Sequence, residues 1–313
     1  MTGAVHNERG MVLLLVLLIV ALLTALVIDF SASTLVDLRL AETHRDSTQA
    51  YYLAKGGINV GRMLLQEDRN NFDARSEMWG QGLDEYPVDD NAAITIKIDD
   101  LDGRIACNRL MMTNNNIDVE LKQRLLRLFQ RVLDISADEA LELVNNLRDW
   151  LDPDDDGAAE SNYYLRLEPP YRAKNGALDT FNELVMVKGF DAPRVARLEP
   201  HLSAFGGPGT NINTASAEVI QALAEEIDQA AAEAIIDYRT STPIKAIKDL
   251  EGVAGLNDAY PALSTKATAL TAPLTVKSEH YRIRTAAYVN EGTRRLEALV
   301  TKTGNQLHYL KIL

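Results

Sequence analysis

The stretch NERGMVLLLVLLIVALLTALVIDF, residues 7–30, decides how this chain is organised. No charged residue occurs between Met11 and Ile28, and a helix of that length rises about 27 Å, close to the thickness of a hydrocarbon core. A cleavable secretory signal has a shorter apolar region followed by a small-residue site such as A-x-A, and the residues from Asp29 to Ser33 match such a site poorly. The stretch therefore predicts a retained membrane anchor, with a secretory signal peptide as the alternative.

The segment after this stretch predicts that the helix continues. Residues 31–65 contain no proline, and apolar residues recur at spacings of three, four and seven, which is typical of a helix with one buried face. The membrane helix is expected to run on into a water-exposed amphipathic helix that packs on a globular domain, about 50 residues in all. The expected buried positions are Leu35, Leu38, Tyr51, Ala54, Ile58 and Leu65.

The composition excludes several classes of protein. A chain of 313 residues with a formal charge of −13 lacks the basic surface that nucleic-acid binding requires. The single cysteine, Cys107, excludes an intramolecular disulfide and a CxxC redox or zinc site, and its neighbourhood GRIACNRL predicts a buried side chain. The five histidines lack ligand spacing, and no nucleophile elbow, P-loop or zinc-protease helix occurs. The sequence therefore predicts that the protein is not an enzyme.

The strand-forming residues fall into two pieces that lie far apart in the sequence. AAITIKIDDLDGRIACN, residues 92–108, alternates and is expected to form a hairpin that turns at Asp102-Gly103. Residues 281–313 predict three antiparallel strands, separated by Asn290-Glu291-Gly292 and by Gly304-Asn305. One face of such a sheet must be covered, and the helix that ends near Leu65 would cover it.

Mainly helical periodicity fills the interval between these two pieces. We therefore predict an α+β fold, with a long N-terminal helix packed on a small antiparallel sheet that a large α-helical domain interrupts. The sheet is expected to be divided between residues 67–110 and 271–313, and the helical insert to span residues 111–270.

The predicted insert contains an internal repeat. One copy runs from IACNRLMMTNN through EALELVNNLRDWL to FNELVMVKGF, and the other runs from TNINTASAEVI through AAAEAIIDYRT to IKDLEGVAGL. The second copy is similar to a helix-hairpin-helix unit, in which a Gly-x-Gly hairpin presents backbone amides to a phosphate. Here the hairpin reads EEIDQAAA, which lacks glycine and carries Glu225, Glu226 and Asp228. A membrane-anchored helix-hairpin-helix DNA-binding protein is the alternative function, and these acids argue against it.

An acidic loop, RDWLDPDDDGAAESNYY at residues 148–164, interrupts the first copy of the repeat. Its carboxylates match positions one, three, five and nine of an EF-hand calcium loop and its glycine matches position six, but position twelve, which requires glutamate, is Tyr163. The loop is therefore either a calcium site of another kind or a solvated acidic loop. The matching residues are Asp152, Asp154, Asp156, Gly157 and Glu160, and Asp149 is a further candidate ligand.

The order of these parts resembles one family over essentially the whole chain. Gly10 before an apolar run is similar to a type IV prepilin leader. A long helix, a small sheet and an insert with NLRDWLDPDDDG, EPPYRAKN, NELVMVKGF and NINTAS resemble the type II secretion system minor pseudopilin K, also called general secretion pathway protein K. The sequence departs from the family pattern at Glu8, beside Arg9, and at Ser161, where family members often carry an acid.

The resemblance implies a processed anchor. Prepilin peptidase would cut after Gly10 and remove the leader, residues 1–10. Met11 would then be the first residue and would be N-methylated. In the helix that follows, residues 11–30 would cross the membrane and residues 31–66 would be soluble. The fifth mature residue is then Leu15, where most pilins carry a glutamate that pairs with the amine of a neighbouring subunit. A charged residue there costs about 2.5–3.5 kcal/mol on insertion and requires a partner. A subunit with nothing above it has no use for that glutamate.

The resemblance also implies a function and partners. Members of this family have a pilin-like fold with a helix-hairpin-helix or SAM-like insert. They are placed at the tip of the pseudopilus, in complex with minor pseudopilins I and J. This protein is thus expected to be a single-pass bacterial inner-membrane protein with a periplasmic C-terminal domain. It would initiate the pseudopilus that exports folded periplasmic proteins across the outer membrane. Calcium is the expected cofactor and no nucleic acid is expected as a partner.

Overall fold

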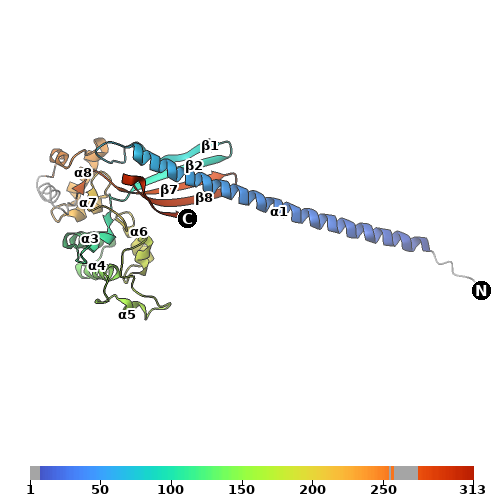
Figure 1. The fold of residues 1–313 in the computed structure, drawn as a ribbon, viewed down its shortest axis with the longest axis horizontal. Helices are drawn as coiled ribbons and strands as arrows, with labels where there is room; N and C mark the ends of the chain where they lie inside the picture. Colours follow the sequence, from blue (N-terminus) through green and yellow to red (C-terminus); the bar gives the residue numbers. More distant parts are fainter. Residues whose placement is uncertain (1–7, 254, 257–273) are drawn as a thin grey trace, which may run out of the picture.

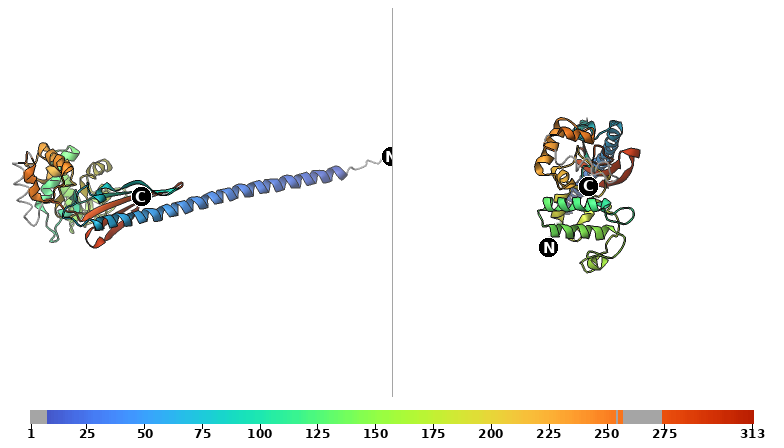
Figure 2. Two further views of the ribbon diagram at one scale, coloured as in Figure 1. Left: turned by 90° about the horizontal axis from the view of Figure 1, so that it is seen from above. Right: turned by 90° about the vertical axis from the view of Figure 1, so that its left-hand side faces the viewer.

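A long helix, a sheet beside it and a helical part beyond the sheet make up the molecule. The computed structural model describes residues 8–253, 255–256 and 274–313 (Figure 1). Helix α1, Glu8–Glu67, is 60 residues long, and its C-terminal part lies along the sheet while its N-terminal part projects away from it. The helical part lies at the end of the sheet opposite to this projection, as both side views show (Figures 1 and 2).

The sheet is antiparallel throughout and has the order β1-β2-β7-β8-β9. The three strands predicted from the C-terminal sequence are confirmed, and β7 and β8 pair in register from His280–Thr301 to Val289–Gly292. The strands are β1 Leu83–Asp89, β2 Ala92–Asp100, β7 His280–Val289, β8 Gly292–Thr301 and β9 Leu307–Ile312.

Helix α1 covers one face of this sheet, as its sequence predicts. Ala54, Ile58 and Leu65 are buried against β2, β7 and β8. The prediction is wrong for Leu35 and Leu38, which are 62% and 54% exposed. These two residues lie in the part of α1 that extends past the end of the sheet, so no strand covers them (Figure 1).

The predicted hairpin over residues 92–108 is wrong. Strand β2 ends at Asp100, and β3 (Ile105–Ala106) pairs in parallel with β4 (Leu202–Ser203). The hairpin partner of β2 is β1, whose exposed, proline-containing sequence LDEYPVD shows no alternation of apolar and polar residues. Pro87 is tolerated there because β1 is an edge strand, which needs only one ladder of hydrogen bonds.

The helical part consists of short helices connected by turns. Its α-helices are α3 Val119–Leu133, α4 Ala137–Leu151, α5 Ser161–Tyr164, α6 Ala192–Leu198, α7 Ala217–Leu223 and α8 Gln229–Ser241. The remaining short elements of the described chain are α2 Met78–Gln81, η1 Cys107–Leu110, η2 Phe181–Met186, β5 Thr210–Asn211, η3 Ile247–Gly252, β6 Leu274–Thr275 and η4 Thr303–Asn305.

The internal repeat is visible in matching hydrogen bonds. In the first copy, the Asn108 side chain accepts from Leu178 N at 2.7 Å and donates to Leu178 O at 2.9 Å. In the second copy, Asn213 accepts from Ile244 N at 2.9 Å and donates to Ile244 O at 2.8 Å. Each copy thus uses an asparagine to fasten its first segment to the chain that leads into its closing 3-10 helix.

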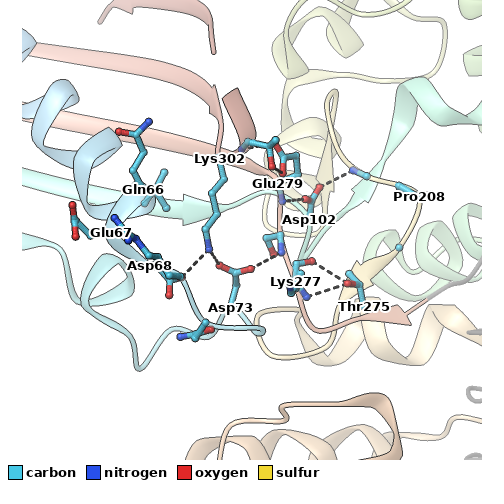
Figure 3. Close-up of a pocket in the computed structure, with 17 residues that line it drawn as sticks. Gln66, Glu67, Asp68, Asp73, Asp102, Pro208, Thr275, Lys277, Glu279 and Lys302 are labelled. Atoms are coloured by element: carbon cyan, nitrogen blue, oxygen red, sulfur yellow. Dashed lines mark hydrogen bonds and ion pairs between the residues drawn. The ribbon is translucent and has the colours of Figure 1, made fainter. Parts of the chain in front are cut away.

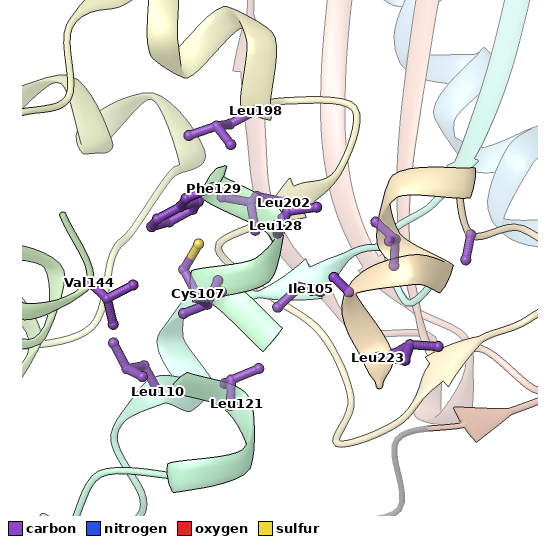
Figure 4. Close-up of a cluster of buried hydrophobic side chains, with 14 of the residues drawn as sticks. Ile105, Cys107, Leu110, Leu121, Leu128, Phe129, Val144, Leu198, Leu202 and Leu223 are labelled. Carbon is purple, nitrogen blue, oxygen red and sulfur yellow. The ribbon is translucent and has the colours of Figure 1, made fainter. Parts of the chain in front are cut away.

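The buried apolar residues form two separate cores. One lies between α1 and the sheet, and the other fills the helical part. Cys107 lies in the helical core, fully buried beside Phe129 and Leu110, as predicted (Figure 4). Burial raises the pKa of its thiol to about 12, so this cysteine stays an inert apolar side chain.

Buried polar groups connect the two parts. Asp100 and Asp102, at the end of β2, are 9% and 3% exposed. Asp100 accepts hydrogen bonds from Asn211 at 3.0 Å, from Ser278 at 2.7 Å and from Thr214. These bonds tie the start of the second repeat to the segment that enters β7.

Asp102 gathers donors from segments more than 100 residues away in sequence. Its carboxylate accepts from Gly207 N at 2.7 Å, from Glu279 N at 2.6 Å and from His280 N at 3.1 Å, and it pairs with His280 Nδ1 at 3.1 Å. Burial favours a high pKa for Asp102, but His280 and the backbone amides outweigh it and lower the pKa. Burial likewise favours a low pKa for His280, but the hydrogen bond and charge of Asp102 raise it above 6.5.

The contact between α1 and the sheet is expected to depend on glycine at one position. A Cβ at Gly57 would lie 2.5 Å from Ile94 Cδ1 and 3.0 Å from Thr285 Cγ2, whereas one at Gly56 would meet nothing within 4 Å. We expect Gly57→Leu to lower the free energy of unfolding by about 1–3 kcal/mol through overpacking. Gly56→Leu should instead raise it by up to about 1 kcal/mol through helix propensity. Thermal unfolding of the full-length protein in detergent measures both, and equal effects would contradict the close approach.

The Asp102–His280 pair predicts a pH-dependent contribution to stability. Because the pKa of His280 is higher in the folded than in the unfolded protein, its stabilisation is complete below pH 6.5 and is lost as pH rises through the folded-state value. We expect His280→Gln to lower the free energy of unfolding by about 1–2 kcal/mol at pH 6 and by less at pH 8.5. His44→Gln, on the exposed surface of α1, is the matched control and should have little effect at either pH. A penalty for His280→Gln that is the same at both pH values would contradict the ion pair.

Candidate functional site

The acidic loop lies between the end of α4 and the start of α5. Aromatic packing holds its two ends together, because Trp150 packs edge-on against Tyr164 with ring centroids 5.2 Å apart, and Tyr164 stacks on Tyr171 at 5.0 Å. From the segment that follows, Gly176 N donates to Trp150 O at 3.2 Å. The loop is therefore fixed on both sides by the fold of the first repeat.

Three of the five predicted ligands converge. Oxygen atoms of Asp149, Asp152 and Glu160 lie within 4.8 Å of one another, and all three residues are buried. Two oxygens bound to one calcium ion at 2.3–2.6 Å lie up to about 5 Å apart, so this spacing fits a single ion. The other two candidates, Asp154 and Asp156, are exposed and lie outside this group, and Asp154 accepts from Asp156 N at 2.9 Å.

The three buried carboxylates differ in their hydrogen bonds. Each carboxylate oxygen of Asp149 has a donor, since Oδ1 accepts from Arg148 Nε at 3.0 Å and Oδ2 accepts from Ala159 N at 3.0 Å. Within the described chain, Oδ1 of Asp152 and both carboxylate oxygens of Glu160 are buried without any hydrogen-bond partner. Buried carboxylate oxygens without donors are unfavourable, and a cation at this point would satisfy them.

The pKa values of Asp152 and Glu160 show the same deficit of positive charge. Burial, followed by the charge of Asp154, raises the pKa of Asp152 to about 6. Burial, followed by the charge of Asp149, raises the pKa of Glu160 to about 7. Arg148 approaches Asp152 at 3.5 Å, and its single charge does not offset the group. The donor set and its electrostatics therefore fit a divalent cation with a preference for oxygen ligands.

A second acidic group provides a contrast. Asp68, Asp73 and Glu77 also bring oxygens within 4.8 Å of one another, beside an open cavity of about 700 Å³. Here the ammonium of Lys302 lies between two of the acids, 2.8 Å from Asp68 and 2.6 Å from Asp73 (Figure 3). A lysine thus supplies a positive charge between the acids of this second group, whereas Asp152 and Glu160 in the acidic loop keep carboxylate oxygens without a described partner.

Two contacts of the acidic loop were not predicted from the sequence, although Gly157 matches position six of the calcium-loop pattern. A Cβ at Gly157 would overlap the carboxylate of Asp149, so glycine is required for close approach. Asn175, from the EPPYRAKN motif, donates to Asp154 O at 2.6 Å and fastens the outer side of the loop. Their spacing in the sequence gives no sign of either contact, because both depend on how the loop closes.

The N-terminal candidates lie on the exposed surface of α1. Met11 is 71% exposed and Leu15 is 56% exposed, and nothing lies within 4 Å of a Cβ built at Gly10. Residues 1–7 of the predicted leader lie outside the described residues. Within the described chain, α1 is the one helix long and apolar enough to cross a membrane.

The second repeat has the helix-hairpin-helix arrangement, formed by α7 and α8, but its hairpin ends in an acid. The carboxylate of Asp228 caps α8 by accepting from Ala231 N at 2.8 Å. Glu225 and Glu226 are exposed beside it. A carboxylate thus occupies the helix N-terminus at which a DNA phosphate would bind, so the structure gives the DNA-binding alternative no support.

Comparison with known families identifies the helical part. Residues 103–209 and residues 210–277 match the first and second parts of the family described as type II secretion system (T2SS), protein K. The boundary between the two matches falls between the two copies of the repeat.

Curated relatives extend the similarity to the whole chain. Type II secretion system protein K of Pseudomonas aeruginosa is 30% identical over 247 residues, which cover 75% of this chain and 73% of the relative. The protein of the same name from Aeromonas hydrophila is 28% identical, covering 95% of this chain and 94% of the relative. Type II secretion system protein K of Klebsiella pneumoniae is 27% identical, and the similarity covers 96% of this chain and 94% of the relative.

A solved structure shares the fold. It is a chain of the GspK–GspI–GspJ complex from the type 2 secretion system of enterotoxigenic Escherichia coli, with a TM-score of 0.69 and 18% sequence identity. The similarity covers 87% of this chain and 99% of that chain. The pilin-like helix and sheet, the helical insert and the relatives agree, and this chain belongs to the type II secretion system protein K family of minor pseudopilins.

Proposed function

We propose that this minor pseudopilin stands at the tip of the pseudopilus and initiates its assembly. The observation that carries the proposal is the position of the helical part, which lies beyond the sheet at the end opposite to the projecting half of α1 (Figure 1). In a fibre built from parallel N-terminal helices, a part of that size at this end would obstruct the subunit stacked above it. A terminal position avoids the obstruction.

Leu15 supports the same position. Cleavage after Gly10 makes Leu15 the fifth residue, so this subunit offers no carboxylate to the amine of a subunit added later. Minor pseudopilins I and J are the proposed partners, which agrees with the complex in which the structural relative was solved.

The membrane-spanning half of α1 is the proposed anchor. It would hold the protein in the bacterial inner membrane with the sheet and helical part in the periplasm, until prepilin peptidase removes residues 1–10 and Met11 is methylated. The exposed apolar surface of α1 would then pack against the helices of neighbouring subunits in the fibre. The assembled pseudopilus would export folded periplasmic proteins across the outer membrane.

Calcium is the proposed ligand of the acidic loop. Asp149, Asp152 and Glu160 would hold the ion, with Asp154 and Asp156 close enough in sequence to contribute through loop movement. The bound ion would neutralise the buried carboxylates and connect the end of α4 to the start of α5. The proposed role of the ion is therefore to stabilise the structure of the loop.

Removal of calcium is expected to destabilise the protein. An ion that binds only the folded state stabilises it by RT ln(1 + [L]/Kd), about 2.7 kcal/mol at a hundredfold excess over Kd. Thermal unfolding of the full-length protein in detergent, with calcium or with a chelator, measures this difference. Asp152→Asn and Glu160→Gln should each abolish most of the calcium-dependent increase in Tm, because each replaces a buried, negatively charged ligand with a neutral amide.

The control for these variants is Glu168→Gln, which removes one negative charge from an exposed position just beyond the loop. It should leave the calcium-dependent increase unchanged. A Tm that does not differ between calcium and chelator in the unmodified protein would refute the calcium site and leave the family assignment intact.

The tip position predicts where the protein occurs on isolated fibres. Antibody raised against the helical part should label the ends of sheared pseudopili and not their sides, as seen by immunogold electron microscopy. Gly10→Ala should retain residues 1–10, which gives a heavier protein by mass spectrometry, and should remove the label because the polar leader keeps α1 out of the helical bundle.

Gly56→Ala, at an exposed glycine of the same helix, is the control and should be processed and incorporated normally. Leu15→Glu should still enter the membrane and remain at fibre ends, since a tip subunit has no amine above it to pair with. Label distributed along the shaft would contradict the proposed position.

A further inference from the structure

A small basic cavity lies in the first repeat, away from the acidic loop. It has a volume of about 40 Å³, and its charged lining residues are Arg104, Arg109, Arg124 and Asp118. Its described lining thus carries three guanidinium groups and one carboxylate, in a chain whose formal charge is −13. Buried Ile105 and Leu121, labelled in Figure 4, complete its wall with apolar surface.

Separate segments of the chain position the three arginines. Arg104 precedes β3 and donates from Nη1 to Glu199 O at 2.8 Å, while Arg124 lies in the middle of α3 and is 5% exposed. Arg109 lies in η1 at the exposed rim, and its guanidinium forms no hydrogen bond or ion pair with any other described residue. The three side chains therefore reach one space from three directions.

Asp118 is the one acid among the described residues that line the cavity. Asp118 caps α3 by accepting from Leu121 N at 2.9 Å, and its own amide donates to Leu110 O at 2.9 Å. This capping role fixes the position of the carboxylate at the start of α3. Burial lowers the pKa of Arg104 to about 10 and lowers that of Arg124, which reflects the unfavourable desolvation of these charges.

We propose that this cavity binds a small oxyanion, a phosphate or a carboxylate, between the guanidinium groups of Arg104, Arg109 and Arg124. Guanidinium groups bind planar or tetrahedral oxyanions through paired N–H donors, and they do so best in surroundings from which water is partly excluded. A volume of about 40 Å³ corresponds to about three water molecules, which a single anionic group could replace. The ligand is a small free oxyanion from solution, either phosphate or a carboxylate.

The site is independent of the tip position and of calcium. The Gly207–Pro208 segment that closes one side of the cavity is also held by Asp102 at the junction with the sheet, through the 2.7 Å bond from Gly207 N. An anion bound here would therefore contact the helical part where it joins the sheet.

Calorimetric titration of the full-length protein in detergent, without divalent cations, tests the site with inorganic phosphate. We expect saturable binding at one site in the unmodified protein and at least tenfold weaker binding in Arg109→Gln, whose exposed side chain can be changed without disturbing the core. Arg109→Lys keeps the charge and should weaken binding less than Arg109→Gln. Repeating the titration in the presence of acetate distinguishes the two ligands. If acetate at the same concentration as phosphate competes with it strongly, the site prefers carboxylates. If acetate competes weakly, the site prefers phosphate.

The matched control is Arg166→Gln, which removes one exposed positive charge outside the cavity. Its phosphate affinity should stay within twofold of the unmodified protein. Equal weakening by Arg109→Gln and Arg166→Gln would show a nonspecific charge effect and overturn the proposal. Absence of saturable phosphate and acetate binding in the unmodified protein would overturn it as well.

Discussion

The carboxylates of Asp100 and Asp102 hold this molecule together at the point where its two parts meet. The sheet and the helical part have separate cores, so apolar packing alone does not fix one relative to the other. The two buried acids at the end of β2 accept hydrogen bonds from Asn211, Gly207 and the segment entering β7. A buried acid keeps this position only when its donors are in place, and the junction therefore has one well-defined arrangement.

The outline of the fold could be predicted because its strongest signals are local. Helix α1 follows from an apolar run and a stripe at helical spacing, and β7, β8 and β9 follow from alternation between turn residues. The repeat was recognisable from its asparagines, and the structure explains why, since Asn108 and Asn213 each bind the backbone of one buried residue. These signals need no knowledge of distant contacts.

The failures of prediction concern distant contacts. Asp102-Gly103 has the composition of a hairpin turn, yet donors at positions 207 and 280 convert it into a crossover between the two parts. Within the candidate site, linear spacing favoured Asp154 and Asp156, because an EF-hand template places ligands at alternate positions. The structure instead groups Asp149 and Glu160 with Asp152, since Gly157 lets the loop fold back onto the last turn of α4. The basic cavity has no sequence signature, because its arginines come from three separate segments: the bend before β3, η1 and α3.

The continuity of α1 has a mechanical consequence. Sixty residues of uninterrupted helix extend about 90 Å, without proline, from the apolar N-terminal end to the last turn that packs on the sheet. A continuous helix compresses little along its axis. An axial displacement of its N-terminal half is therefore transmitted almost in full to the sheet and the helical part. A force applied to the membrane-spanning half of α1 would then displace the sheet and the helical part along the axis of the helix.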